Sequence, residues 1–319
     1  MSGAVRPLRI AMVGTGGFAA RHLEVLAREG GVEVAGHVSR TLAPAEAQAL
    51  RHGGRAYADV DELLAQERLD AAWITVPPHA HGPIEHALIA AGVPFFVEKP
   101  LSGDRATGEA IARAVADAGL IAGVGYHWRA LDTIAELRAR LAAGPPVALV
   151  TGTWLSSTPP PAWWRKQASS GGQFVEQATH LLDLARHLLG EAVVTHAAAD
   201  RRPRPHHPDA DVAAVGAATL RFAAGALGVF TATCVLGGSA RVELQLMREG
   251  ELITVTQGSV VYDDGRERRE VRVKVDPVAT EDRAFLEAVR SGDGGVLVCD
   301  YADAARSHAL AHEVVAAAA

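Results

Sequence analysis

Three glycines and an alanine follow the first apolar run of the chain, in a spacing that suits phosphate binding. Residues 8–13 lead directly into Gly14-Thr15-Gly16-Gly17-Phe18-Ala19, which matches the pattern G-x-G-x-x-A. Between a strand and a helix, the first glycine allows a tight turn, the second lets the backbone approach a pyrophosphate, and the small alanine permits close packing. The helix N-terminus would add N–H donors. A glycine-rich turn without a ligand is the alternative, but the predicted strand and helix around it favour a dinucleotide.

The residues after the second apolar run, 32–38, bear on which dinucleotide would bind. An NAD site places a carboxylate there to hold the ribose hydroxyls, whereas the 2′-phosphate of NADP needs a cation. This chain carries Ser39, Arg40 and Thr41 instead. Arg40 can pair with a phosphate while the two hydroxyls donate hydrogen bonds to it. The sequence therefore favours NADP(H), and NAD(H) remains the alternative if Arg40 lies over the adenine.

Lys99 is one of only three lysines among 31 basic residues, and it follows the apolar run 94–97 within Glu98-Lys99-Pro100. In an open parallel sheet, ligands bind beyond the carboxyl ends of the strands. Lys99 could donate a hydrogen bond to a substrate hydroxyl and stabilise alkoxide charge that develops near the nicotinamide. The alternative is an ordinary surface lysine at the end of a strand.

A second group of chemically useful side chains comprises Glu176, His180 and Asp183. If this segment is one helix, the three lie on one face at i, i+4 and i+7. The ordinary pKa of histidine lets His180 take and give a proton near neutrality, and a carboxylate one turn earlier could orient it or hold a substrate hydroxyl. The three residues could instead be surface polar groups, or Glu176 and His180 could be half of a metal site. We expect no metal, because further ligands are not evident and hydride transfer does not need one.

A long loop over residues 154–167 contains Trp163, Trp164 and Lys166. Aromatic faces beside cations could line a carbohydrate pocket, and they could equally well pack the loop.

The elements that must position these residues follow two patterns. Over residues 8–124, short β-rich runs alternate with amphipathic segments, which is typical of βαβ units and a doubly wound parallel sheet. Beyond Gly144-Pro145-Pro146, successive strands are joined by turns that contain glycine, which indicates a largely antiparallel sheet. We therefore predict an α/β nucleotide-binding domain over residues 1–125 and a second, α+β domain over residues 126–319. The predicted strands are 8–13, 32–38, 71–76, 94–97, 121–124, 147–154, 193–199, 212–222, 226–235, 242–248, 252–256 and 271–275.

Length and composition exclude several classes of protein. The 319 residues are 49% apolar and 21% charged, which fits an ordinary globular chain of two domains. A net charge of -6 argues against nucleic-acid and anionic-membrane partners. The two cysteines cannot form a disulfide framework, no apolar run approaches the roughly 18 residues that span a bilayer, and the N-terminus lacks a secretory layout. We expect a soluble cytoplasmic protein.

Taken together, these motifs resemble the glucose-fructose oxidoreductase and inositol dehydrogenase family (Gfo/Idh/MocA) over essentially the whole chain. The matching segments are the glycine turn, Val76-Pro77-Pro78-His79-Ala80-His81, Glu98-Lys99-Pro100, Gly125-Tyr126-His127-Trp128-Arg129, and Gly171-Gly172 leading to Glu176 and His180. The resemblance implies an N-terminal Rossmann domain and a C-terminal domain with an open, mainly antiparallel sheet and helices on one face. That sheet would form homodimers or homotetramers.

The resemblance also assigns roles to residues. Lys99 would lie beside the nicotinamide, and His180 would be the acid/base on a sugar or polyol hydroxyl. The other expected cofactor contacts are Val76, Pro77, Pro78, His81 and Glu98. The expected substrate contacts are Tyr126, His127, Arg129, Trp163, Trp164, Lys166 and Asp183. Glu176 stands where many relatives have Asp, and His127 where Asn is common, so substrate identity is less constrained than reaction type.

The leading prediction is thus an NADP(H)-preferring oxidoreductase that interconverts alcohol and carbonyl on a sugar, inositol or related polyol. Lys99 and His180 would assist the proton transfer, and Glu176 would position His180 or the substrate. One alternative is a nucleotide-sensing regulatory protein without chemistry, against which the presence of both Lys99 and His180 argues. Another is a glycosidase that uses a tightly bound cofactor for transient oxidation.

Overall fold

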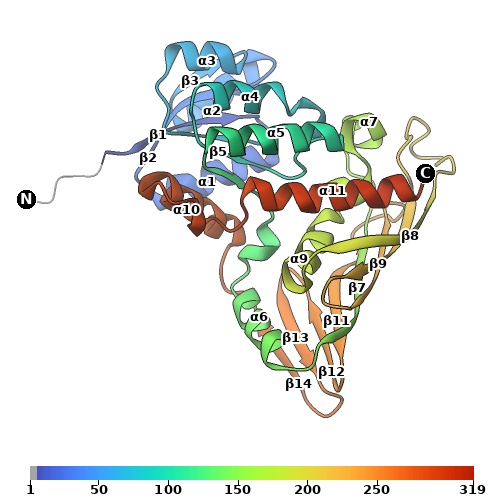
Figure 1. The fold of residues 1–319 in the computed structure, drawn as a ribbon. Coiled ribbons are helices and arrows are strands. Elements are labelled where there is room, and N and C mark those ends of the chain that lie inside the picture. The colour runs from blue at the N-terminus through green and yellow to red at the C-terminus, as the bar shows by residue number, and fades with distance from the viewer. Residues whose placement is uncertain (1–5) are drawn as a thin grey trace, which may run out of the picture. The chain divides into compact units, whose positions relative to one another are not determined.

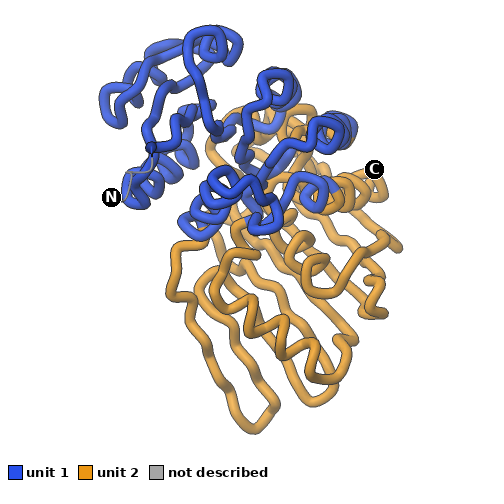
Figure 2. Tube along the Cα trace, turned by 60° about the vertical axis from the view of Figure 1, so that its left-hand side comes forward, with its two compact units in different colours: residues 1–101, 106–126, 278–305 blue, residues 102–105, 127–277, 306–319 orange. Residues whose placement is uncertain are grey.

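The computed structural model describes residues 6–319, which divide into two compact units (Figure 2). The first unit contains the residues up to 101 with 106–126 and 278–305, and the second contains 102–105, 127–277 and 306–319. The sequence predicted one boundary after residue 125, whereas the structure assigns the late segment 278–305 to the first unit. Phe285 and Leu286 of this segment pack in the core of the first unit, and Trp73 Nε1 donates a hydrogen bond to Asp282 at 2.8 Å, contacts that no sequence pattern encodes.

A six-stranded sheet forms the centre of the first unit, in the order β3-β2-β1-β4-β5-β6 (Figure 1). Its pairings are all parallel, as the sequence predicted. Alternate residues of the central strand enter different cores, since Ile10 and Met12 pack on one face and Ala11 and Val13 on the other. The strand order changes direction between β1 and β4, which makes the carboxyl ends of these strands the switch point where ligands bind. The strands are β1 (Leu8–Val13), β2 (Val32–Val38), β3 (Arg55–Tyr57), β4 (Ala71–Ile74), β5 (Phe95–Val97) and β6 (Ala122–Val124).

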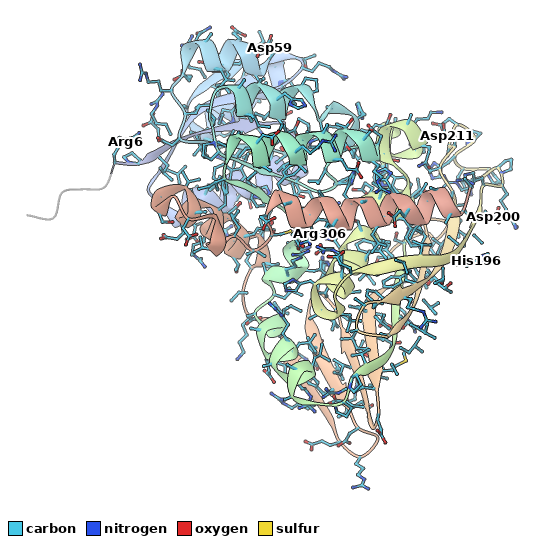
Figure 3. All side chains as sticks on the ribbon, viewed as in Figure 1. Arg6, Asp59, His196, Asp200, Asp211 and Arg306 are labelled. Carbon is cyan, nitrogen blue, oxygen red and sulfur yellow. The ribbon has the colours of Figure 1, made fainter. Side chains whose placement is uncertain are left out.

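Amphipathic helices cover this sheet. In the first of them, Ala19, Leu23 and Leu26 are buried against the core. Capping is visible at α3, where Asp59 accepts a hydrogen bond from the backbone N–H of Glu62 at 2.8 Å (Figure 3). The helices are α1 (Gly17–Glu29), α2 (Leu42–His52), α3 (Val60–Gln66), α4 (Pro83–Ala90), α5 (Arg105–Ala118) and α10 (Pro277–Ser291), with short 3-10 turns η1 (Pro78–Ala80) and η4 (Gly294–Val296).

An eight-stranded sheet forms the second unit, in the order β14-β13-β12-β11-β7-β10-β9-β8. Every pairing is antiparallel except that of β7 with β10, which confirms a mainly antiparallel sheet. The strands are β7 (Val147–Leu155), β8 (Ala192–Asp200), β9 (Val215–Phe222), β10 (Leu227–Thr233), β11 (Arg241–Arg248), β12 (Glu251–Val255), β13 (Ser259–Asp263) and β14 (Arg268–Arg272).

One face of this sheet packs on helices, and the other face is open. Burial alternates strictly along β9, so Leu220 and Phe222 enter the helix-covered core. On the open face, Val215, Leu227 and Val229 are all more than a third exposed. The second unit's helical elements are η2 (His127–Ala130), α6 (Thr133–Ala143), η3 (Ala162–Arg165), α7 (Gln167–Ser170), α8 (Gln173–Glu176), α9 (Thr179–Leu189) and the later part of α11 (Tyr301–Ala317). None of the described helices is long and apolar enough to cross a membrane.

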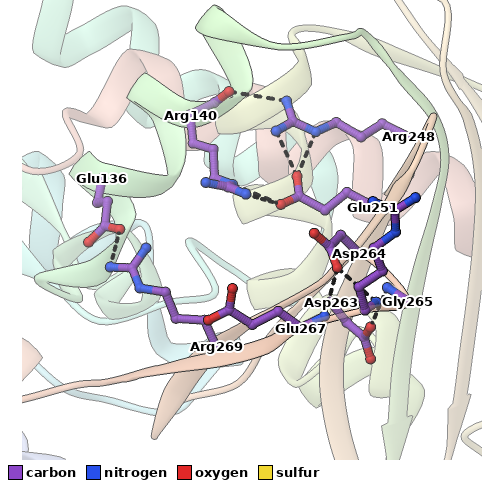
Figure 4. A network of polar contacts seen from close by, with 10 residues as sticks. Glu136, Arg140, Arg248, Glu251, Asp263, Asp264, Gly265, Glu267 and Arg269 are labelled. Carbon is purple, nitrogen blue, oxygen red and sulfur yellow. Dashed lines mark hydrogen bonds and ion pairs between the residues drawn. The ribbon is translucent and has the colours of Figure 1, made fainter.

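Charged side chains fasten α6 to the hairpin of β11 and β12 (Figure 4). Glu251 accepts hydrogen bonds from Arg140 Nε at 2.8 Å and from Arg248 Nε at 2.7 Å. Burial acts to raise the pKa of Glu251, but the two guanidinium groups outweigh it and hold the pKa below its ordinary value. The paired carboxylate therefore stays ionised and keeps the end of the hairpin on α6.

Three strands differ most from the sequence prediction. The structure contains β3 and β13, which the sequence did not predict, and β14 covers 268–272 rather than 271–275. Lys274 consequently lies beyond the last strand, where its backbone N–H donates to the Asp132 carboxylate at 3.3 Å. β3 and β14 are short strands at the edges of their sheets, so their pairing depends on the neighbouring strand more than on their own apolar pattern, whereas β13 lies between β12 and β14.

Candidate active site

The glycine turn lies at the switch point of the parallel sheet. Gly14 has a φ of +112°, and a Cβ there would stand 2.6 Å from Thr75 Oγ1 at the end of β4. Only glycine combines this conformation with this close approach. A Cβ at Gly16 or Gly17 would meet nothing within 4 Å, so open space lies in front of the N-terminus of α1. The turn therefore fits the pyrophosphate of a dinucleotide, which the first N–H groups of α1 would bind.

The residues expected to select the dinucleotide lie beside this turn. Ser39 Oγ is 3.3 Å from Thr15 Oγ1, which brings the ends of β1 and β2 together. Arg40 is exposed, and Thr41 is the exposed N-cap of α2 without a side-chain capping bond. Arg40 and the three hydroxyls thus stand at the edge of the sheet where the ribose of a bound dinucleotide would lie.

The loop after β4 places Val76, Pro77 and Pro78 at the same carboxyl edge of the sheet. His81, which the family resemblance grouped with them, is 6% exposed, and its Nδ1 lies 2.5 Å from Glu85 Oε1. Glu85 lies in the first turn of α4 and also accepts a hydrogen bond from the Gly82 N–H at 2.7 Å, so it links His81 to the N-terminus of that helix. A cofactor contact of His81 stays a prediction.

Lys99 stands two residues beyond β5, and its neighbour Glu98 turns into the protein. The backbone N–H of Glu98 donates to the Ile74 carbonyl at 2.9 Å, which continues the pairing of the strands. The Glu98 carboxylate is 3.1 Å from Nε2 of the fully buried His22. Nδ1 of His22 is in turn 2.8 Å from the Asp282 carboxylate. A buried ion network thus lies next to Lys99.

The charge of His22 follows from these partners. Burial acts to lower the pKa of His22, but the Asp282 and Glu98 carboxylates outweigh it and raise the pKa to about 10. His22, Glu98 and Glu281 offer ligand atoms within 4.8 Å of one another, as a metal site would. Both ring nitrogens of His22 lie within hydrogen-bond distance of carboxylates, Nδ1 of Asp282 and Nε2 of Glu98. We therefore describe these residues as an ion network.

Sequence analysis missed His22 and Asp282. A signal was present for the first of them, because His22 lies on the buried stripe of α1 with Ala19, Leu23 and Leu26. A polar residue in an apolar stripe needs a buried partner. The partner stands 260 residues later, and no local pattern identifies it.

In the second unit, the expected single helix through Glu176, His180 and Asp183 is wrong. Helix α8 ends at Glu176 and α9 begins at Thr179, and the two residues between them interrupt the regular helix. The chain tightens there, since the His180 N–H donates to the Gln177 carbonyl three residues back at 3.3 Å. The three side chains therefore do not share one helix face, and each has its own surroundings.

His180 lies in the first turn of α9 and is 3% exposed. Its ring is stacked on Trp154, with centroids 6.1 Å apart and planes 17° apart. The His127 ring meets it edge-on at 4.5 Å. The side-chain amide of Gln257 lies 2.9 Å from His127 Nε2, which fixes the second imidazole. The two histidines therefore form a pair held by aromatic packing and one amide.

The carboxylates of Glu176 and Asp183 accept hydrogen bonds from residues other than His180. Trp164 Nε1 donates to Glu176 Oε2 at 2.7 Å. Asp183 is fully buried and accepts hydrogen bonds from Arg129 Nε at 2.8 Å and from Ser307 Oγ at 2.6 Å. Burial raises the pKa of Asp183, although the Arg129 guanidinium opposes the shift. Arg129 and Asp183 thus form a buried ion pair rather than two open groups.

The other residues that we expect to contact substrate pack against, or form hydrogen bonds with, other parts of the protein. Tyr126 is fully buried in the core of the first unit. Trp164 is buried in a small cluster with Val212 and Cys234, against which Trp163 packs. Lys166 Nζ donates to the Asp209 carbonyl. Figure 3 shows Asp211 near α7, where its carboxylate accepts a hydrogen bond from the Gln167 N–H at 2.5 Å. A contact of these residues with substrate stays a prediction.

Comparisons with known proteins agree with this architecture. A family model described as "Oxidoreductase family, NAD-binding Rossmann fold" (GFO_IDH_MocA) matches residues 8–126, and a model of the GFO/IDH/MocA C-terminal domain matches residues 133–261. The chain is similar to 4-carboxy-2-hydroxymuconate-6-semialdehyde dehydrogenase of Sphingobium sp. strain SYK-6, with 26% identity over 89% of this chain and 91% of the relative. It is also similar to scyllo-inositol 2-dehydrogenase (NAD(+)) of Bacillus subtilis, with 30% identity over 43% of this chain and 40% of the relative.

Among solved structures, the fold is similar to that of KijD10, a 3-ketoreductase from Actinomadura kijaniata in complex with NADP and TDP-benzene. The TM-score is 0.84, the sequence identity is 19%, and the match covers 98% of each chain. At this identity the likeness concerns the fold alone.

Proposed function

This chain belongs to the Gfo/Idh/MocA oxidoreductase family, and from that premise we propose an NADP(H)-preferring dehydrogenase of sugars, inositols or related polyols. It would interconvert a secondary alcohol and a ketone, or an aldose and its lactone. The observation that carries the proposal is the position of Lys99, which follows β5 at the carboxyl edge of the same sheet whose switch point carries the glycine turn. One rigid sheet would thus position both the bound dinucleotide and the side chain that donates to the substrate oxygen.

The residues divide the chemistry between them. The nicotinamide cofactor would supply hydride exchange with the reacting carbon. In the oxidative direction, neutral His180 takes the hydroxyl proton, and Lys99 donates a hydrogen bond to the oxygen as negative charge develops on it. Because the Glu176 carboxylate is held by Trp164, we assign Glu176 to a substrate hydroxyl rather than to His180.

A panel of sugars and inositols, screened by nicotinamide absorbance with NADP and NAD, tests this proposal. We expect turnover with at least one polyol or its carbonyl form. Cofactor binding without turnover on any member of the panel would contradict the proposal and favour a regulatory protein. A cofactor that survives dialysis, with glycoside cleavage and no net absorbance change, would favour transient oxidation instead.

The preference for NADP depends on Arg40. Arg40→Ala should weaken NADP binding about tenfold to a hundredfold, because a hydrogen bond to a charged group is worth about 1.5–3 kcal/mol. NAD affinity should change little, since NAD lacks the 2′-phosphate. Fluorescence titration measures both, with Arg28→Ala, another exposed arginine of the first unit, as the matched control. Tighter binding of NAD than NADP by the unaltered protein would reverse our assignment.

We further propose that the chain forms a homodimer or homotetramer through the open face of the second unit's sheet. The support is the row of exposed apolar side chains there, in which Val229 stands on the inner strand β10. Val229→Glu should shift the protein to monomers in size-exclusion chromatography with light scattering. Leu50→Glu, at an 89% exposed position of the first unit, is the control that should not. A monomeric unaltered protein at micromolar concentration would refute the proposal.

A further inference from the structure

A buried row of polar side chains leads from α10 to the residue before Lys99. Trp73 Nε1 donates to Asp282 at 2.8 Å, Asp282 accepts from His22 Nδ1 at 2.8 Å, and His22 Nε2 is 3.1 Å from Glu98. All of these residues belong to the first unit, and each is at most 5% exposed. The proton transfer proposed above uses none of their side chains, although Glu98 is among the expected cofactor contacts.

Glu98 is fixed on several sides. Its N–H is bonded to the Ile74 carbonyl at 2.9 Å, and a Cβ at Gly125 would stand 2.7 Å from Glu98 Oε1, so the carboxylate fills the space beside the end of β6. Glu98 is buried, whereas Lys99, the next residue and part of the bend that follows β5, is partly exposed. Holding the Glu98 carboxylate inward therefore fixes the backbone from which Lys99 extends.

The charges make His22 necessary to this arrangement. The carboxylates of Asp282 and Glu98 both face its imidazole, Glu281 lies close by on α10, and the rings of Phe18 and Phe96 flank it. Among these groups His22 is the only cation. Without it, Glu98 would be a buried carboxylate that has lost its counter-charge, so it would have to turn toward water or take up a proton. Either change would disturb the direction of Lys99.

We propose that His22 and Asp282 are positioning residues, which hold Glu98 so that Lys99 stays aimed at the substrate oxygen. This inference rests on the proposed function, because it presupposes that Lys99 acts on substrate. A displacement of about 1 Å at a catalytic group can cost about a hundredfold in rate. The pair would thus act on turnover through geometry, without touching substrate or cofactor.

A double-mutant cycle between His22 and Lys99 tests the proposal. His22→Gln should lower kcat about tenfold to a hundredfold, with the KM for substrate and the affinity for NADP nearly unchanged. In a Lys99→Ala background the same substitution should lower kcat no further, because no amine remains to be aimed. A role confined to stability would lower kcat by the same factor in both backgrounds, and that result would overturn the proposal.

Controls separate this inference from its premise. If Lys99→Ala alone leaves kcat intact, the proposed role of Lys99 is wrong. If Lys99→Ala lowers kcat, but the double variant shows the product of the two single reductions in kcat, only the positioning role is wrong. Asp282→Asn replaces His22→Gln in the cycle should the latter fail to fold, as judged by thermal unfolding. His37→Gln is the matched control: it also removes a fully buried imidazole of the first unit, bonded to the Gly53 carbonyl at 3.0 Å, and should leave kcat unchanged.

Discussion

Replacing His180 with alanine is expected to lower kcat by about two to four orders of magnitude, the range in which positioned general acid–base groups contribute. NADP(H) affinity should stay close to that of the unaltered protein, since the glycine turn and Arg40 bind the cofactor in our assignment. The structure explains why the loss should be large. His180 is fixed by Trp154 and His127, so its imidazole is preorganised.

The measurement is steady-state turnover on the substrate that the panel identifies, together with cofactor titration. His180→Gln should be nearly as impaired as His180→Ala, because an amide keeps a hydrogen bond but transfers no proton. His187→Ala, in the last turn of the same helix, is the control and should keep normal turnover. Near-normal turnover in His180→Ala would remove this residue from the mechanism.

Lys99→Ala should also lower kcat, by about a hundredfold to a thousandfold, which is the cost of losing one preorganised donor to a developing oxyanion. Lys99→Arg should restore little, because the planar guanidinium presents its donors in a different geometry from a compact ammonium. Lys274→Ala is the control, since Lys274 lies beyond the last strand of the second unit. Activity of Lys99→Ala within about fivefold of normal would refute the assignment, a margin far below the expected loss.

The sequence predicted the parts of this molecule that local patterns encode. Strands β1 and β2 begin and end where their apolar runs do, and the positive φ of Gly14 confirms the tight turn. Strand β3 has no apolar run of the kind that β5 and β6 carry, since only Tyr57 of its three residues is buried, and it is completed by pairing with β2. Strand β13 buries alternate residues, and its place is set by pairing with β12 and β14.

The candidate site was predicted less completely, for a related reason. The spacing of Glu176, His180 and Asp183 is correct for one helix, but spacing does not reveal a break at two intervening residues. The partners that decide what these groups do are Trp164 for Glu176 and Arg129 for Asp183, and both come from other elements. Tertiary contacts of this kind override local propensity.

The discontinuity of the first unit constrains how the chain can fold during synthesis. The ribosome finishes the parallel sheet by residue 124, yet Asp282 and Phe285, which close over Trp73, are made more than 150 residues later. Until then Trp73 lacks the Asp282 carboxylate and the Phe285 ring, and His22 lacks Asp282, so apolar surface that is buried in the finished protein stays exposed. The nascent cofactor-binding unit is thus an incomplete intermediate throughout translation of the second unit. A chain that ends before residue 278 would therefore have a damaged N-terminal unit, although it still contains every strand of the parallel sheet.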